Sequence, residues 1–130
     1  MIEAPTTIDQ AGGDNYAALQ QNLPIYFKRN IANMIAITKE NHIKTLLATW
    51  AYSPHFGDNA SQDYYQQAYA EQNDIVRQFA NTHQVPVFDF SAKMPQSEHF
   101  WADGHPVNEE GARLKAELFA EFIDKAGLLK

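Results

Sequence analysis

The chain has 130 residues, of which 45% are hydrophobic and 12% aromatic, and its formal net charge is −6 at pH 7. These values are typical of a globular chain, and we expect one α/β domain over residues 1–130 with a polar irregular opening over 1–15. The acidic balance, without a Lys/Arg cluster, argues against nucleic acid as a partner, because nucleic-acid affinity depends on cation–phosphate contacts. Because there is no cysteine, disulfides, thiolate catalysis and zinc–thiolate sites are excluded.

Targeting signals are not evident in this sequence. No apolar run approaches membrane-spanning length, so we expect no membrane span. The opening residues MIEAP lack the basic start and the apolar core of a signal peptide, and nothing in the chain predicts export. The compartment therefore stays open.

The first periodic segment covers roughly residues 24–41. Pro24 suits the first turn of a helix, and we expect an amphipathic helix here. The side chains that recur at helical spacing are Phe27, Ile31, Met34, Ile35 and Thr38. A short uncharged run follows at residues 45–50, which is typical of a strand buried on both faces, as in a parallel sheet.

A loop, a second helix and a second strand follow. Residues 51–59 contain Pro54, Gly57 and an Asp-Asn pair, a composition typical of a loop. Helical spacing then resumes up to about Thr82, over Tyr65, Ala68, Gln72, Ile75, Val76 and Phe79. Residues 85–90, VPVFDF, predict a short strand in which a proline is tolerated at the beginning.

The last helix has the clearest boundaries. Asn108 can cap it, and Glu109 and Glu110 favour the positive end of its dipole. One apolar stripe follows, made by Leu114, Leu118, Phe119, Phe122, Ile123 and Ala126, and Gly127 fits a C-terminal cap. Because strands alternate with long helices, the pattern predicts right-handed crossovers, a parallel sheet and an α/β sandwich.

Asp103 and His105 stand on the loop before this helix, after the aromatic pair Phe100-Trp101. An Asp and a His two residues apart can orient and protonate one another, which is the working half of a hydrolytic triad. The Asp-Gly-His-Pro stretch is also good turn chemistry in any protein. The residues alone leave both interpretations open.

Four blocks of the chain resemble the C-terminal half of the SGNH/GDSL hydrolase family: LLATW at 46–50, VFDF at 87–90, FWADG at 100–104 and NEEGAR at 108–113. The resemblance covers about residues 16–125. Members of this family are esterases, lipases and acylhydrolases. The resemblance implies a flavodoxin-like three-layer α/β/α sandwich, here N-terminally shortened, with parallel strands at about 45–50 and 85–90.

The resemblance also implies site roles. The last block of the family reads Asp-x-x-His, followed by Asn and Gly, and its Asp and His serve a Ser on an early Gly-Asp-Ser-Leu block. Asp103 would then orient His105, the general base. The chain lacks the Ser, Gly and Asn blocks; GGDN at 12–15 is similar to the Gly-x-Asn-Asp block, with its last two residues reversed. Counting from Asp103 through Asn108 to Gly111 puts Pro106 at the family His position, with His105 one position earlier.

Other polar and aromatic residues are weaker candidates. Trp50, Tyr52 and Trp101 could line an acyl pocket, or could be core or rim residues. Ser53 follows a strand and is the candidate for a substitute nucleophile, although it lacks a nucleophile-elbow sequence. The histidines show no His-x-x-x-His or His-Glu-x-x-His spacing, so we expect no metal and no cofactor.

Three hypotheses remain. The chain could be part of an SGNH-type hydrolase acting on a small ester or acyl substrate, whose turnover in isolation should be weak or absent. It could be a non-catalytic α/β module for self-association or partner binding. It could also be a hydrolase with a different nucleophile such as Ser53. Two strands expose apolar edges and leave part of each helix stripe, such as Leu114, Leu118 and Phe122, without a sheet to cover, so we expect a homodimer.

Overall fold

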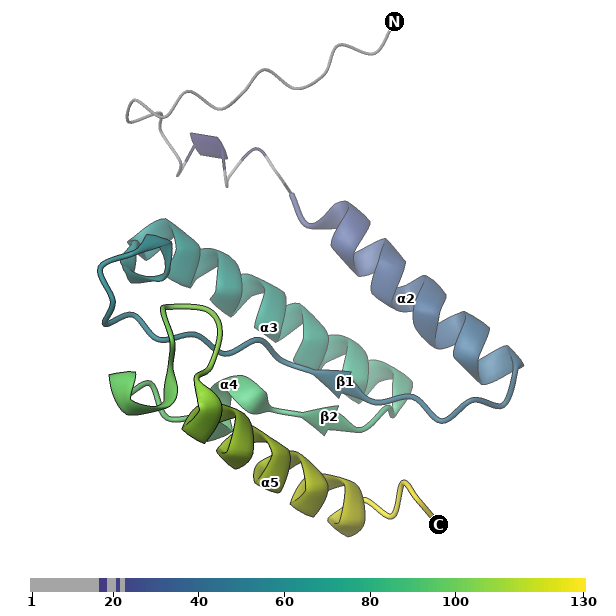
Figure 1. Ribbon diagram of the computed structural model, residues 1–130. Helices are drawn as coiled ribbons and strands as arrows, with labels where there is room; N and C mark the ends of the chain where they lie inside the picture. The colour runs from purple at the N-terminus through teal and green to yellow at the C-terminus, as the bar shows by residue number, and fades with distance from the viewer. Residues whose placement is uncertain (1–16, 19–20, 22) are drawn as a thin grey trace, which may run out of the picture.

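The computed structural model describes residues 17–18, 21 and 23–130 (Figure 1). The expected polar opening and the GGDN stretch at 12–15 lie outside these residues. The helices in chain order are α2 (Ile25–Glu40), α3 (Asp63–His83), α4 (Phe90–Lys93) and α5 (Glu109–Lys125). The strands are β1 (Leu47–Ala48) and β2 (Val87–Phe88), and two short 3-10 turns are η1 (Asn59–Ser61) and η2 (Glu98–Phe100).

The two strands pair in parallel, with Leu47 opposite Val87 and Ala48 opposite Phe88. The predicted parallel neighbours are therefore confirmed. The predicted length is wrong, because each strand has two residues rather than six. β1 ends early because the backbone of Trp50 bonds to a side chain of α3, and β2 ends early because Phe90 begins α4.

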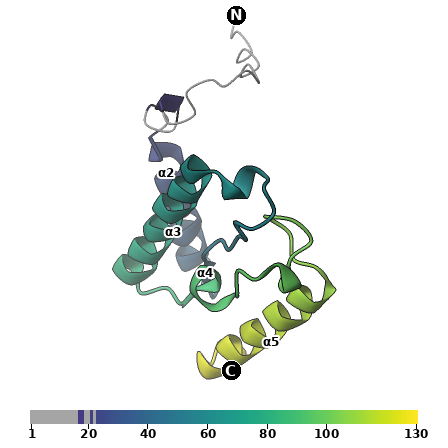
Figure 2. The same cartoon turned by 90° about the vertical axis from the view of Figure 1, so that its left-hand side faces the viewer.

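Helices cover both faces of this sheet, which gives three layers (Figures 1 and 2). α2 and α3 pack on one face through a buried cluster made by Ile31, Ile35, Ile75 and Val76. α5 packs on the other face, where the ring of Phe88 lies 5.2 Å from that of Phe119 and 5.5 Å from that of Phe122. The carboxyl ends of both strands, and the loops that follow them, lie between these layers.

The helix boundaries follow the local sequence closely. The Asn108 side chain accepts a 2.9 Å hydrogen bond from the Gly111 N–H, which confirms the predicted cap of α5. Gly127 follows the helix with φ +63, a conformation that glycine adopts without steric cost. No helix in the described part of the chain has the length and apolar character that crossing a membrane requires.

The sequence predicted that part of the apolar stripe of α5 would be uncovered, and this prediction is wrong. Leu114, Leu118 and Phe122 pack against the buried cluster around Phe88. Large exposed apolar side chains instead gather on α2 and the residues just before it: Leu23, Ile25, Tyr26, Met34 and Ile37. The large exposed apolar side chains of α2 therefore lie on the layer opposite α5.

Candidate active site

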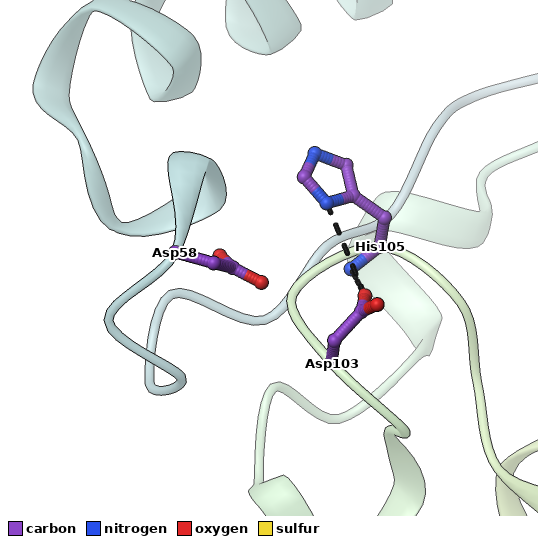
Figure 3. Close-up of side chains that lie close together, drawn as sticks. All are labelled: Asp58, Asp103 and His105. Atoms are coloured by element: carbon purple, nitrogen blue, oxygen red, sulfur yellow. Dashed lines mark hydrogen bonds and ion pairs between the residues drawn. The ribbon is translucent and has the colours of Figure 1, made fainter.

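The Asp103–His105 turn is the tip of a short loop that leads into α5. An antiparallel bridge between Trp101 and Val107 closes the base of the loop, and the Ala102 N–H donates to the Pro106 carbonyl at 3.0 Å. Asp103 Oδ1 accepts a 2.7 Å hydrogen bond from the backbone N–H of His105. The same oxygen lies 4.0 Å from His105 Nδ1, which is beyond hydrogen-bond distance (Figure 3). Asp103 thus stabilises the turn and faces the imidazole without bonding to it.

A second carboxylate, Asp58, reaches this turn from the loop after β1. Asp58 Oδ2 accepts a 2.7 Å bond from the Gly104 N–H, and Oδ1 accepts a 2.9 Å bond from the Ala60 N–H. Figure 3 shows the Asp58 carboxylate directed toward the loop that carries Asp103 and His105. Sequence analysis missed Asp58, whose only local signal is the loop composition around it.

Four aromatic side chains, which we call the aromatic wall, form one set of neighbouring rings: Trp50, Tyr52, Tyr65 and Tyr69. The ring of Tyr69 stacks on Tyr52 at 4.9 Å and on Trp50 at 6.4 Å. The His105 ring lies edge-on to Tyr65 and Tyr69, at 6.2 and 6.1 Å. The predicted residues Trp50 and Tyr52 are therefore linked to His105 through Tyr69, one of two tyrosines of α3 that the sequence did not single out for the site.

Two phenols of the wall have raised pKa values. Burial raises the pKa of Tyr52. The pKa of Tyr69 is also raised, first by burial and then by the charges of Tyr65, Asp58 and Tyr52. Tyr52 and Tyr69 therefore keep neutral hydroxyl groups at neutral pH.

Ser53 and Trp101 occupy positions that do not fit the roles considered for them. Ser53 is fully buried, and its Oγ donates a 2.6 Å bond to the Gln96 carbonyl. Trp101 is 3% exposed, and its Nε1 donates a 2.7 Å bond to the Pro95 carbonyl. Burial places the first hydroxyl out of reach of a substrate carbonyl and makes Trp101 a core residue. Both side chains bond to the 95–96 segment.

The other serines of the chain also have bonds elsewhere. Ser61 Oγ donates to the Asp58 carbonyl at 2.7 Å. Ser91 Oγ bonds to Asp89 at 3.1 Å, and Ser97 Oγ accepts a bond from the His99 N–H at 3.4 Å. None of these contacts brings a hydroxyl to His105. Within the described residues the site has a candidate base without a nucleophile.

The side chains of Asp58, Asp103 and His105 are also of the types that bind divalent cations. Each offers one oxygen or nitrogen atom, and these atoms lie within 4.8 Å of one another. The two carboxylates already accept hydrogen bonds from the N–H groups of Ala60, Gly104 and His105. Those bonds account for the cluster without an ion.

A separate groove of about 610 Å³ lies between α2 and α3. Its lining includes Leu23, Lys28 and Glu71, and does not include the Asp103–His105 turn. The groove between α2 and α3 is therefore separate from the candidate site at Asp103 and His105.

Comparison with known proteins shows similarity in structure. No protein-family model and no curated protein sequence matches the chain. The crystal structure of a candidate acylhydrolase from Bacteroides fragilis superposes with a TM-score of 0.63 at 28% sequence identity, over 76% of this chain and 50% of that one. A GDSL-like lipase from Bacteroides thetaiotaomicron gives a TM-score of 0.63 at 24% identity, over 78% of this chain and 52% of that one, which is a likeness of fold.

The chain spans about half the length of each of these structures. Both matches agree with the resemblance seen in the blocks at 46–50, 87–90, 100–104 and 108–113, and confirm it at the level of the fold. This chain therefore has the fold of about half of a GDSL-like lipase or acylhydrolase structure.

Proposed function

We propose that this chain carries the Asp/His part of a Ser-His-Asp ester-hydrolase site. The observation that carries the proposal is the place of the Asp103–His105 turn. The Gly104 carbonyl accepts a 3.0 Å bond from the Ser53 N–H, so the turn lies against the segment that leaves the carboxyl end of β1. Ligands of open parallel sheets bind at such ends.

In this proposal His105 is the general base and Asp103 orients it. A serine hydroxyl attacks the ester carbonyl, a bond forms between Oγ and the carbonyl carbon, and the hydroxyl proton passes to the imidazole. The imidazolium returns that proton to the leaving alcohol as the C–O bond breaks, and water releases the acyl group by the same route. Since the four serines of the chain bond elsewhere, the proposal requires a serine from a segment outside these 130 residues.

The side-chain geometry is compatible with these roles after a small movement. A separation of 4.0 Å between Asp103 Oδ1 and His105 Nδ1 must close to a hydrogen bond. Catalytic hydrogen bonds are often long without substrate and shorten in the complex. The aromatic wall beside the imidazole offers apolar surface and neutral hydroxyl groups for a small ester or acyl substrate.

A non-catalytic binding module is the second candidate function. The observation that favours it is the exposed apolar side of α2, where Tyr26, Met34 and Ile37 are 67%, 54% and 62% exposed. The third hypothesis, with Ser53 as nucleophile, is disfavoured because that hydroxyl is fully buried.

Hydrolysis of p-nitrophenyl acetate tests the proposal. The chain alone should show only weak turnover, because loss of a triad member costs roughly 10³-fold or more in rate. His105→Ala should abolish the residual rate, and His99→Ala, which changes an exposed histidine on the same loop, should not. A measurable rate of hydrolysis that is the same for the chain and for His105→Ala would contradict the catalytic role and favour the binding module. Loss in Ser53→Ala with retention of the fold would revive the third hypothesis.

A further inference from the structure

Asp58 makes two hydrogen bonds of different kinds. One is local: Oδ1 accepts from the N–H of Ala60, two residues on, and caps the short turn η1. The other joins distant parts of the chain: Oδ2 accepts from the N–H of Gly104, 46 residues away. A capping role explains the first bond and leaves the second unexplained.

Gly104 is held on both sides of its peptide backbone. Its N–H donates to Asp58 at 2.7 Å, and its carbonyl accepts from the Ser53 N–H at 3.0 Å. A Cβ at position 104 would overlap the Asp58 carboxylate and lie 2.5 Å from the Ala60 Cβ. Only glycine allows the turn to approach the 53–60 segment this closely.

His105 follows directly on this clamped residue. Its imidazole lies edge-on to Tyr65 and Tyr69, and its side chain is 33% exposed. Asp103, the other neighbour of Gly104, is 54% exposed and bonds only to the backbone N–H of His105 in the contacts around this turn. The hydrogen bonds that attach the Asp103–His105 turn to the 53–60 segment are therefore those at Gly104.

The Asp58 carboxylate also lies near the imidazole itself. One of its oxygens and a ring nitrogen of His105 are within 4.8 Å of one another. The negative charge of Asp58 contributes to the raised pKa of Tyr69, after burial and the charge of Tyr65, and Tyr69 contacts the His105 ring. Asp58 is therefore close to both His105 and Tyr69.

We infer that Asp58 is a positioning residue for His105, which acts through the Gly104 N–H and holds the imidazole against Tyr65 and Tyr69. The inference rests on the proposed function, in which His105 transfers the proton. It adds a carboxylate from outside the Asp103–His105 block, one that does not touch the reacting atoms. Holding the base within a fraction of an ångström of its working position is what such a contact supplies.

Nuclear magnetic resonance of the whole chain tests the inference without depending on turnover. Nuclear Overhauser effects between the His105 ring protons and the rings of Tyr65 and Tyr69 report the position of the imidazole. Asp58→Ala should abolish them and should also shift the Gly104 amide. Asp58→Asn keeps the shape and one acceptor oxygen, so it should retain the effects at least in part, and it serves as the second variant if Asp58→Ala does not fold.

Ser97→Ala is the matched control, because Ser97 also caps a 3-10 turn, η2, and does not contact Gly104. It should leave the His105 effects unchanged. Retained effects in Asp58→Ala, with a shift of the Ala60 amide alone, would show that Asp58 is only a cap and overturn the inference. Equal loss in Ser97→Ala would also overturn it, because any weakened turn would then release the imidazole.

Turnover separates this inference from the proposed function. In an active form of the protein, Asp58→Ala should lower kcat about 10- to 100-fold and leave KM unchanged, as outer contacts to a working side chain do. Loss of the ring contacts with an unchanged kcat would confirm that Asp58 positions the His105 ring, but it would contradict the proposed role of His105 in proton transfer. A change in KM with an unchanged kcat would mean that Asp58 affects substrate binding, and would overturn the inference that it positions His105.

Discussion

At the scale of single residues, the side chain of Asn73 makes the two backbone hydrogen bonds that a neighbouring strand would otherwise make just past β1. It projects from α3, is 5% exposed, and accepts the Trp50 N–H at 2.7 Å while donating to the Trp50 carbonyl at 2.8 Å. One amide therefore satisfies both backbone groups of a residue just past the strand. The same contact fixes the residue whose ring stacks on Tyr69.

Replacement of Asn73 tests this role. Asn73→Ala should destabilise the chain by about 1–3 kcal/mol, because two partly buried backbone groups lose their partners. The free energy of unfolding in urea measures the change. Gln72→Ala, at the exposed neighbouring position, should stay within about 0.5 kcal/mol of the parent chain. Equal midpoints for the two variants would mean that water replaces the amide without cost.

At the scale of elements, one carboxylate joins α3, β1 and α4. Asp89 Oδ2 accepts from Arg77 Nε at 2.9 Å, and Asp89 Oδ1 accepts from Thr49 Oγ1 at 2.8 Å. The N–H of Ser91 donates to Thr49 Oγ1 at 2.9 Å, so the start of α4 is held to the end of β1. The hydrogen bond from Arg77, followed by those from Thr49 and Ser91, lowers the pKa of Asp89 to about 2, against the smaller opposing effect of burial.

This network predicts acid sensitivity with a defined sign. The carboxylate of Asp89 is stabilised in the folded chain, so its contribution is complete above its ordinary pKa of 3.8 and is lost as pH falls toward about 2. After a discount for solvent screening, the loss should be about 1–2 kcal/mol. Unfolding free energies measured between these pH values should fall for the parent chain and fall less for Asp89→Asn. Parallel pH profiles for both chains would contradict the prediction.

At the scale of the whole molecule, the sheet is narrow and its covering is uneven. β1 has β2 as its one neighbour among the described residues, and Ala48 within it is exposed. The apolar side of α2 is exposed on the same half of the fold, with Met34 and Ile37 more than half exposed. The part that superposes is 76–78% of this chain and only 50–52% of the structures that it matches. We propose that a second copy of the chain covers this surface, since a two-fold contact pairs an apolar patch with itself.

Sedimentation velocity at micromolar concentration tests the homodimer. The parent chain should sediment as a dimer, and Ile37→Glu should dissociate it because a charge then has to be buried in an apolar contact. Glu71→Lys, a charge change at an exposed position on α3, should leave the dimer intact. A stable monomer at all concentrations would contradict the proposal.

Sequence by itself determined the three long helices α2, α3 and α5, the Asn108 cap and the place of Asp103 and His105 in one turn. Each of these depends on residues that are close in the chain, where periodicity and capping chemistry act directly. The resemblance to part of the SGNH/GDSL fold followed from the same short blocks, and the structural matches agree with it.

Tertiary structure alone decided the rest, because it depends on contacts between distant segments. β1 stops after two residues because the Asn73 side chain bonds to the backbone of Trp50, and β2 stops because Phe90 begins α4. Burial removes Ser53 and Trp101 from the surface. Asp58 reaches Gly104 across 46 residues, a contact that periodicity cannot encode because it depends on how the loop after β1 packs against the loop before α5.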